Sequence, residues 1–253
     1  MRAAVAAACL VAALLAAGWA LLRGPSLPDA RVGHVVVISI DGLRPDAIQA
    51  AGAPTLSRLM REGAYSLTAR TVFPSATLPG HTSMLTGVSP AKHGVTWNWD
   101  RTEETGQVAA PTVFDLADSA GLAGAAFYGK SKLHQLFGAD GDGGFQVEGP
   151  EGEEVFEGWE VVQNAENHLR FRRPDLLFVH IVDPDLKGHS QGWMSGPYLR
   201  AVRHADDLVG RVQETARAKF GDDVVLIVTA DHGGHARRHE TRASSDMLIP
   251  WVV

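Results

Sequence analysis

Cysteine is nearly absent from this sequence: the 253-residue chain contains a single one, Cys9. Cys9 lies in an apolar N-terminal segment, so the rest of the chain has no thiol. That excludes disulfide bonds and thiol chemistry from the body of the protein. If the protein performs covalent catalysis, its nucleophile is therefore a hydroxyl, a carboxylate or water.

Long basic runs are also lacking. The longest are the pairs Arg172-Arg173 and Arg237-Arg238, and the net charge of the chain is −6. This charge balance argues against a scaffold that binds nucleic acids. Histidine, by contrast, is frequent, since eleven histidines stand against three tyrosines. A clustering of these histidines would indicate a metal site or an acid–base site.

A segment near the N-terminus lacks charge. The twenty residues from Ala3 to Leu22 are all uncharged and stand between two arginines. About 20 apolar residues are enough to span a bilayer, and small residues near the end of the segment suit a signal peptidase. The sequence therefore predicts a signal peptide or an N-terminal membrane anchor over residues 1–24. We expect an exported protein, periplasmic or extracellular, with a catalytic domain over residues 32–253. Any membrane attachment would run through residues 3–22.

Three apolar, β-branched runs each lead into an aspartate. They are His34–Ile40, followed by Asp41; Leu176–Val182, followed shortly by Asp185; and Val224–Val228, followed by Asp231. Runs of this kind predict strands that are buried on both faces, as in a parallel α/β sheet. Ligands of such sheets bind beyond the carboxyl ends of the strands, so we expect the three carboxylates to meet at one edge.

Two histidines accompany these aspartates. His232 directly follows Asp231, and His189 stands four residues after Asp185, a spacing that lets a loop or short turn bring both to one ion. Carboxylate and imidazole together suit zinc or a similar divalent ion. Two such ions about 4 Å apart can clamp the attacking and leaving oxygens of a displacement at phosphorus.

A hydroxyl candidate stands in the segment 73–87, where two prolines and a glycine frame a helix. Thr77 lies near the predicted N-terminus of that helix, where free N–H groups and the helix dipole favour an anion. Thr77 is therefore a candidate nucleophile, although Thr77 or Ser75 would also suit a plain N-cap. Asn98 is a candidate donor to a phosphoryl oxygen, or else a residue that shapes a turn.

Taken together, these segments resemble the alkaline phosphatase superfamily, specifically its nucleotide pyrophosphatase/phosphodiesterase (type I phosphodiesterase) branch. The resemblance rests on five motifs in the family's order, which are Ile38–Gly42, Phe73–His81, His93–Asn98, Asp185–His189 and Ala230–Gly233. It implies a three-layer α/β/α sandwich around a mostly parallel sheet. It also implies a hydrolase that cleaves phosphodiesters or phosphomonoesters with two divalent ions, most readily Zn²⁺.

The resemblance implies a role for each site residue. Thr77 would be the nucleophile, forming a phosphothreonine intermediate that water then hydrolyses, and Asn98 would stabilise the transition state. The ligands of one ion would be Asp41, Thr77, Asp231 and His232, and those of the other Asp185, His189 and a third histidine. For that third ligand the sequence leaves His239 and His235 open and favours His239, which stands shortly before the apolar run Leu248–Val253.

This sequence departs from the family pattern in two further ways. Ala76 precedes the candidate nucleophile where many relatives carry lysine, so a positive charge is missing there. Relatives also continue past the last apolar run, whereas this chain stops at Val253, which leaves open a C-terminally truncated form.

The superfamily includes other functions that this sequence could serve. A sulfatase needs Cys or Ser in a C/S-x-P-x-R context, and the stretch Thr77–His81 does not provide it. A phosphonate hydrolase stays open, because the sequence does not identify the leaving group, and so does an inactive or truncated member that acts as a binding protein. The expected partner is a small-molecule phosphate ester.

Overall fold

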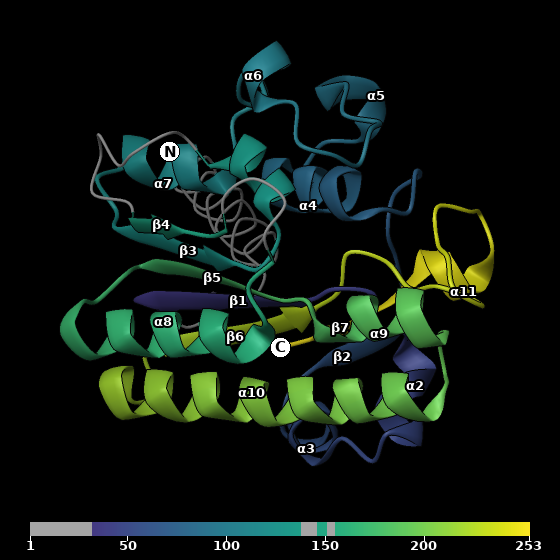
Figure 1. Cartoon of the computed structure of the whole chain (residues 1–253). Helices are drawn as coiled ribbons and strands as arrows, with labels where there is room; N and C mark the ends of the chain where they lie inside the picture. Colours follow the sequence, from purple (N-terminus) through teal and green to yellow (C-terminus); the bar gives the residue numbers. More distant parts are fainter. Residues whose placement is uncertain (1–31, 138–145, 151–154) are drawn as a thin grey trace, which may run out of the picture. The chain divides into compact units, whose positions relative to one another are not determined.

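Seven strands of the described residues form one sheet in the order β2-β7-β6-β1-β5-β3-β4 (Figure 1). The computed structural model describes residues 32–137, 146–150 and 155–253, and the fold is that of the unit Gly33–Val253. The strands are β1 (His34–Ile40), β2 (Tyr65–Arg70), β3 (Gly124–Tyr128), β4 (Gln146–Glu148), β5 (Leu176–Ile181), β6 (Val224–Thr229) and β7 (Leu248–Val252).

The centre of the sheet is parallel. β1 lies between β5 and β6 and pairs with both in parallel, and β3 pairs in parallel with β5 and β4. β7 is antiparallel to β6 and to β2, which closes that side of the sheet. The three strands predicted to deliver aspartates are therefore direct neighbours, and their carboxyl ends lie at the same edge.

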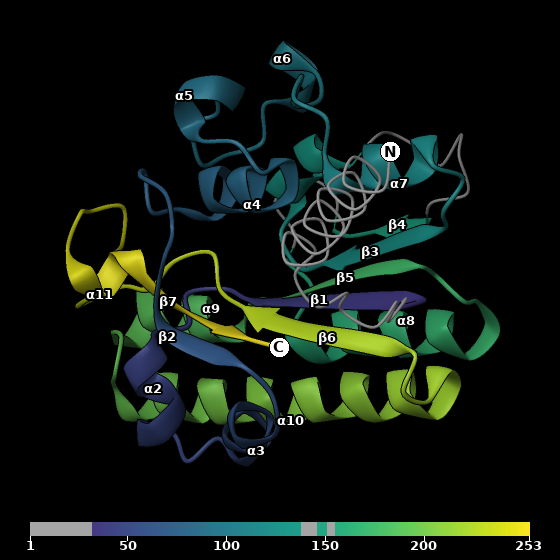
Figure 2. The ribbon, with the colours of Figure 1, turned by 180° about the vertical axis from the view of Figure 1, so that it is seen from behind.

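Helices occupy both faces of the sheet (Figures 1 and 2). Those on one face are α2 (Pro45–Ala50), α3 (Pro54–Glu62), α8 (Gly158–Phe171), α9 (Asp183–Gln191) and α10 (Gly196–Phe220). On the other side are α4 (Thr77–Thr86), α5 (Pro90–His93), α6 (Thr102–Thr105), α7 (Val113–Ser119) and the 3₁₀ helix η1 (Ser131–Leu136), while α11 (Ser244–Met247) precedes β7. The mixed sheet with helices on both sides is the predicted α/β sandwich.

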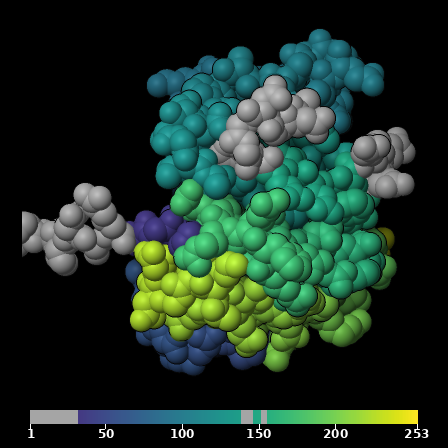
Figure 3. Space-filling view, turned by 90° about the vertical axis from the view of Figure 1, so that its left-hand side faces the viewer, coloured from purple at the N-terminus to yellow at the C-terminus, as the bar shows by residue number. Residues whose placement is uncertain are grey.

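The two faces have separate apolar cores. The larger lies between the sheet and α2, α3, α8 and α10, and the smaller lies under α4, α7 and η1. α10 places an apolar stripe in the larger core, with Tyr198, Val202 and Val209 at most 1% exposed. Figure 3 shows α8 and α10 side by side on the outside of this core.

One prediction about burial is wrong. We expected Val224–Val228 to be buried on both faces, but the first four residues of β6 are partly exposed and burial begins at Val228. Val224 and Leu226 pack against the larger core, whereas Val225 and Ile227 alternate to the other face, where α4 and α7 pack over the β3–β5 half of the sheet.

Among the described residues, no helix combines the length and apolar character needed to cross a membrane. The segment 1–24, expected to be a signal peptide or an anchor, lies outside the described residues. Its role, the domain bounds 32–253 and membrane attachment through residues 3–22 all stay predictions.

Candidate metal centre

The three predicted aspartates meet beyond the ends of β1, β5 and β6. Asp41, Asp185 and Asp231 are all at most 2% exposed. Asp41 directly follows β1, and Asp231 follows β6 after one residue, Ala230. Asp185 stands in the first turn of α9. The expected loop or short turn around Asp185 is therefore wrong, because Asp183–Gln191 is a helix. In that helix the spacing of four residues places His189 on the same face as Asp185.

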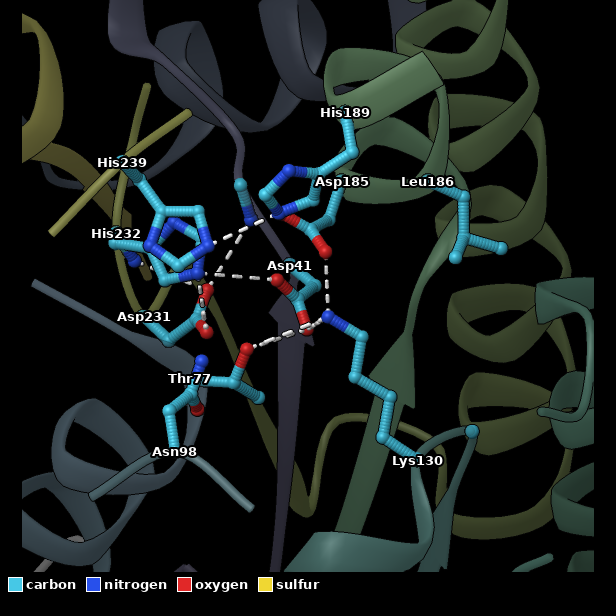
Figure 4. Close-up of polar contacts among 12 residues, drawn as sticks. Asp41, Thr77, Asn98, Lys130, Asp185, Leu186, His189, Asp231, His232 and His239 are labelled. Atoms are coloured by element: carbon cyan, nitrogen blue, oxygen red, sulfur yellow. Dashed lines mark hydrogen bonds and ion pairs between the residues drawn. The ribbon is translucent and has the colours of Figure 1, made fainter. Parts of the chain in front are cut away.

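Three histidines present the same ring nitrogen to these carboxylates (Figure 4). The Nδ1 atom of each lies near a backbone carbonyl oxygen: His232 at 2.7 Å from Gly233, His239 at 2.9 Å from Ser75, and His189 at 3.1 Å from Arg237. Because a carbonyl oxygen only accepts, each Nδ1 carries the proton. The Nε2 lone pairs are then free to bind a metal.

The ligand atoms have the spacing of tetrahedral zinc sites. Zinc bonds of about 2.0–2.1 Å at tetrahedral angles separate neighbouring ligand atoms by about 3.3 Å. Nε2 of His232 lies 3.4 Å from Asp41 Oδ1 and 3.4 Å from Asp231 Oδ2. Nε2 of His189 lies 3.4 Å from Asp185 Oδ1 and 3.1 Å from His239 Nε2. Two such lone pairs repel one another unless a cation lies between them.

Four of these atoms make no hydrogen bond within the described residues although they are buried. They are Asp41 Oδ1, Asp185 Oδ1, Asp231 Oδ2 and His232 Nε2. A buried polar atom left unpaired costs about 1–3 kcal/mol, so the four together indicate a missing partner. Two groups of three side chains have the geometry to hold an ion. One is Asp41, Asp231 and His232, and the other is Asp185, His232 and His239. The residues therefore fit divalent metal ions.

His235, the competing third histidine, points elsewhere. Its Nδ1 lies 2.7 Å from Asp246 Oδ1, and its Nε2 accepts a hydrogen bond of 3.2 Å from Arg238. Asp246 is fully buried and also accepts hydrogen bonds from the backbone N–H and the hydroxyl of Thr241. His235 and Asp246 thus hold the loop that carries His239, and both nitrogens of His235 are occupied.

Thr77 is the first residue of α4, and its fully buried hydroxyl points at Asp41 Oδ2 across 3.5 Å. The N-cap interpretation is wrong for both hydroxyls considered. The N-cap residue is Ala76, which makes no side-chain cap, and Ser75 donates to the carbonyl of Thr241. The Thr77 oxygen is thus not used to begin the helix.

Asn98 lies at the start of the same helix. Its Oδ1 accepts a hydrogen bond of 3.0 Å from the N–H of Leu78, and its Nδ2 donates to Glu240 Oε1 at 3.3 Å. The side chain therefore satisfies one free N–H of α4. Its amide nitrogen thus contacts the loop that carries His239, because Glu240 directly follows that histidine.

The buried carboxylates and the charged groups around them shift one another's pKa values. Burial alone would raise the pKa of Asp41, but the Lys130 ammonium and His180 hold it well below its ordinary value. Burial and the charge of Asp41 raise the pKa of Asp231 to about 7. His232 is buried, yet the two carboxylates raise its pKa, whereas burial and the nearby His232 lower the pKa of His239 to about 3.

The prediction from sequence did not include two side chains that contact Asp41, namely Lys130 and His180. Lys130 is 8% exposed and its Nζ lies 2.8 Å from Asp41 Oδ2. His180 accepts from the N–H of Gly129 at Nδ1, so its Nε2 donates to Asp41 Oδ2 at 2.9 Å. The signal for Lys130 is its place two residues after β3, the same position relative to a strand as that of Asp231 after β6. His180 lies inside β5 and has no comparable signal.

The family model described as "Type I phosphodiesterase / nucleotide pyrophosphatase" matches residues 35–243 of this chain. Among curated proteins, the chain is similar to human ectonucleotide pyrophosphatase/phosphodiesterase family member 1. The identity is 24% over 217 residues, which cover 78% of this chain and 23% of that protein. The chain thus spans about a quarter of the length of this relative.

Solved structures share the fold. Murine ectonucleotide pyrophosphatase/phosphodiesterase 5, in an inactive form in complex with AMP, matches with a TM-score of 0.65 and 24% identity, over 79% of this chain and 57% of that chain. A 2-O GAG sulfatase matches with a TM-score of 0.62 and 13% identity, over 87% of this chain and 63% of that chain. At such identities the likeness shows the fold alone.

Proposed function

We propose that this chain, which belongs to the type I phosphodiesterase/nucleotide pyrophosphatase family of the alkaline phosphatase superfamily, hydrolyses phosphodiesters with the help of two divalent metal ions. The observation that carries the proposal is the set of four buried polar atoms that make no hydrogen bond within the described residues; one of them belongs to Asp41, whose other oxygen lies 3.5 Å from the Thr77 hydroxyl. A protein that did not bind metal would gain nothing from burying them unpaired.

The proposed ligands divide into two sets. One set is Asp41, Thr77, Asp231 and His232, and the other is Asp185, His189 and His239. Zinc is the favoured metal, because the donors are nitrogen and oxygen atoms and their separations of 3.1–3.4 Å suit a tetrahedral ion. When bound, such ions act as Lewis acids that stabilise negative charge on oxygen.

The chain's own residues perform the displacement. Oγ1 of Thr77 attacks phosphorus and loses its proton, the bond from phosphorus to one ester oxygen breaks, and that oxygen leaves with the electron pair and takes up a proton. Water then attacks the phosphorus of the phosphothreonine, which releases a phosphate monoester from a diester substrate and restores the threonine hydroxyl. Thr77 begins α4, so the positive end of the helix dipole lies at the reacting phosphoryl group. The Nδ2 amide of Asn98, now 3.3 Å from Glu240 Oε1, donates to a phosphoryl oxygen when substrate is bound.

Nucleotide esters are the substrate class to examine once the reaction itself is established with nitrophenyl esters, because the murine neighbour was solved with AMP. The sulfatase alternative lacks support at the nucleophile, since Thr77 is followed by Leu-Pro-Gly-His. A phosphonate hydrolase differs from this proposal in its leaving group alone. The charge-free segment 3–22 supports export of the protein, by cleavage or by anchoring.

The test is an assay of purified protein with zinc against three substrates: nitrophenyl phosphate, bis-nitrophenyl phosphate and nitrophenyl sulfate. We expect turnover of the diester, and a loss of about 10³-fold or more in kcat/KM for Thr77→Ala. Thr86→Ala is the matched control, because it removes a hydroxyl from the other end of α4 that donates to the Thr82 carbonyl and accepts from the N–H of Val88, away from the centre. Full activity of Thr77→Ala would disprove the nucleophile assignment, and zinc binding without any turnover would favour an inactive binding protein.

A further inference from the structure

Lys130 lies between the two halves of the metal centre. Its ammonium is 2.8 Å from Asp41 Oδ2, 2.5 Å from Asp185 Oδ2 and 3.3 Å from Thr77 Oγ1 (Figure 4). Asp41 belongs to one proposed ligand set and Asp185 to the other. One side chain, arriving from the end of β3, therefore connects the two sets.

The centre would be strongly negative without this lysine. Asp41, Asp185 and Asp231 are buried together, and within the described residues their ion pairs come from Lys130 and from histidines. Lys132 is two residues further along the chain but donates to the carbonyl of Asn98 instead. A buried carboxylate without a counter-charge costs several kcal/mol, so Lys130 is the permanent positive charge of the site.

The lysine and the proposed ions use different oxygens of the same carboxylates. Lys130 contacts Oδ2 of both Asp41 and Asp185, whereas Oδ1 of each is buried, makes no hydrogen bond to any residue that the structure describes, and faces a histidine Nε2. The ammonium therefore leaves the ligand atoms exposed to an incoming ion. It also fixes the rotation of both carboxylates, so that the Oδ1 atoms face the two ion positions.

We propose that Lys130 is a resident counter-cation: it holds the centre together when metal is absent, and it weakens the binding of metal. In the metal-free protein its charge compensates the buried carboxylates. Once divalent ions bind the Oδ1 atoms, that compensation is redundant, and the ammonium is left next to two more positive charges. Lys130 thus stabilises the metal-free protein more than the loaded one. By linkage, its removal must tighten metal binding by the difference.

This inference rests on the metal binding of the proposed function but not on turnover. The experiment compares wild type, Lys130→Met, Lys130→Arg and Lys187→Met at pH 8, with Zn²⁺ as the probe. Lys187→Met is the matched control, because Lys187 is exposed on α9 two residues beyond Asp185. Zinc affinity is measured by titration against a chelator, and thermal unfolding is followed in excess EDTA and in excess zinc.

We expect Lys130→Met to lower the Tm in EDTA by about 10 °C, to lower it less than half as much in zinc, and to bind zinc at least tenfold more tightly. Lys130→Arg, which keeps the charge, and Lys187→Met should behave like wild type in zinc affinity. If Lys130→Met is unfolded in EDTA, refolding on addition of zinc supports the same conclusion.

Three outcomes overturn the inference. They are zinc affinity of Lys130→Met equal to or weaker than that of wild type, an equal Tm deficit with and without zinc, and a variant that stays unfolded in saturating zinc. Failure of the proposed function is seen separately, because a wild type that binds zinc without turnover still permits every comparison above.

Discussion

Hydrogen bonding at Nδ1 decides which histidines of this protein are available to a metal. His239 bonds to a backbone carbonyl through Nδ1 and keeps Nε2 free, whereas His235, four residues earlier, has both nitrogens engaged by Asp246 and Arg238. A histidine held in this way must stay neutral to serve as a ligand. Its pKa therefore affects stability as well as metal binding.

His239 gives the metal-free protein a pH-dependent stability. Its pKa in the folded protein is lowered to about 3 by burial and by His232, while the unfolded chain has the ordinary value of about 6.5. Between these values the unfolded chain binds more protons, so stability rises with pH across the window and levels off above it. From pH 5 to pH 7 the gain from this one residue is about 2 kcal/mol. We expect His239→Asn to lose that part of the pH dependence in urea unfolding with EDTA.

The control for this measurement is His235→Asn. It removes a histidine from the same loop without touching the free nitrogens of the centre. An unchanged pH slope in His239→Asn would show that His239 is not kept neutral by its surroundings.

Some residues of the site could be predicted from local sequence and others could not. Asp41 and Asp231 were predictable because each ends an apolar run, and strand ends of a parallel sheet meet at one edge. His180 was not, since its role depends on Asp41, which is 139 positions away, and the local sequence of Lys130 offered only its place shortly after a strand. The charge that seemed missing at Ala76 has a counterpart in Lys130, which comes from another strand.

At the scale of elements, α4 and the turn after β6 are packed so closely that a methyl group cannot enter between them. A Cβ added at Gly80 would lie 2.9 Å from the carbonyl oxygen of Asp231 and 3.2 Å from its Cβ. Thr77 and Asp231, from the same proposed ligand set, are thus positioned by backbone contact between α4 and this turn.

Gly80→Ala should therefore separate Thr77 from Asp231 by a few tenths of an ångström. The substitution gains helix propensity of about 1 kcal/mol, which offsets part of the steric cost, so we expect a folded protein. We also expect zinc affinity to fall about tenfold or more, because metal sites tolerate little displacement of their ligands. The measurement is zinc titration alongside urea unfolding.

Gly196→Ala, at the first residue of α10, is the matched helical control, since its added Cβ meets only Arg200 Nη1 at 3.4 Å. Equal zinc affinity in the two variants would contradict the role given to the contact at Gly80.

Most elements were predictable from periodicity, and the exception has a physical reason. β1 has the predicted bounds, His34–Ile40. The segment of α9 was expected to be a loop or short turn, and its Pro184 and Gly188 are residues that usually interrupt helices. Pro184, however, lies in the first turn, where its missing N–H is harmless. Gly188 is needed for packing, since a Cβ there would lie 2.6 Å from the Trp193 ring. Tertiary contacts explain this glycine, and local sequence does not report them.

At the scale of the whole sheet, the two faces differ in how completely they are covered. The face toward α8 and α10 buries Val36, Val179 and Val228 to 1% exposure or less. On the other face, Val225 and Ile227 stay partly exposed, and Trp251 of β7 is 40% exposed. The β-branched run of β6 could not reveal this difference, because a strand's residues show what it can bury but not which neighbour covers it.

This asymmetry predicts different tolerance to the same substitution. Val→Thr keeps the shape and the β propensity of the side chain but adds a hydroxyl, which costs about 1–3 kcal/mol when it is buried without a partner. Val179→Thr, in β5 at 0% exposure, should therefore lower the free energy of unfolding by about 2 kcal/mol. Val225→Thr, on the partly exposed face of β6, should cost less than about 1 kcal/mol, because water can solvate its hydroxyl. Urea unfolding of both variants with zinc present checks the difference. Equal losses would mean that the face of β6 that carries Val225 is covered in solution as completely as the face packed against α8 and α10.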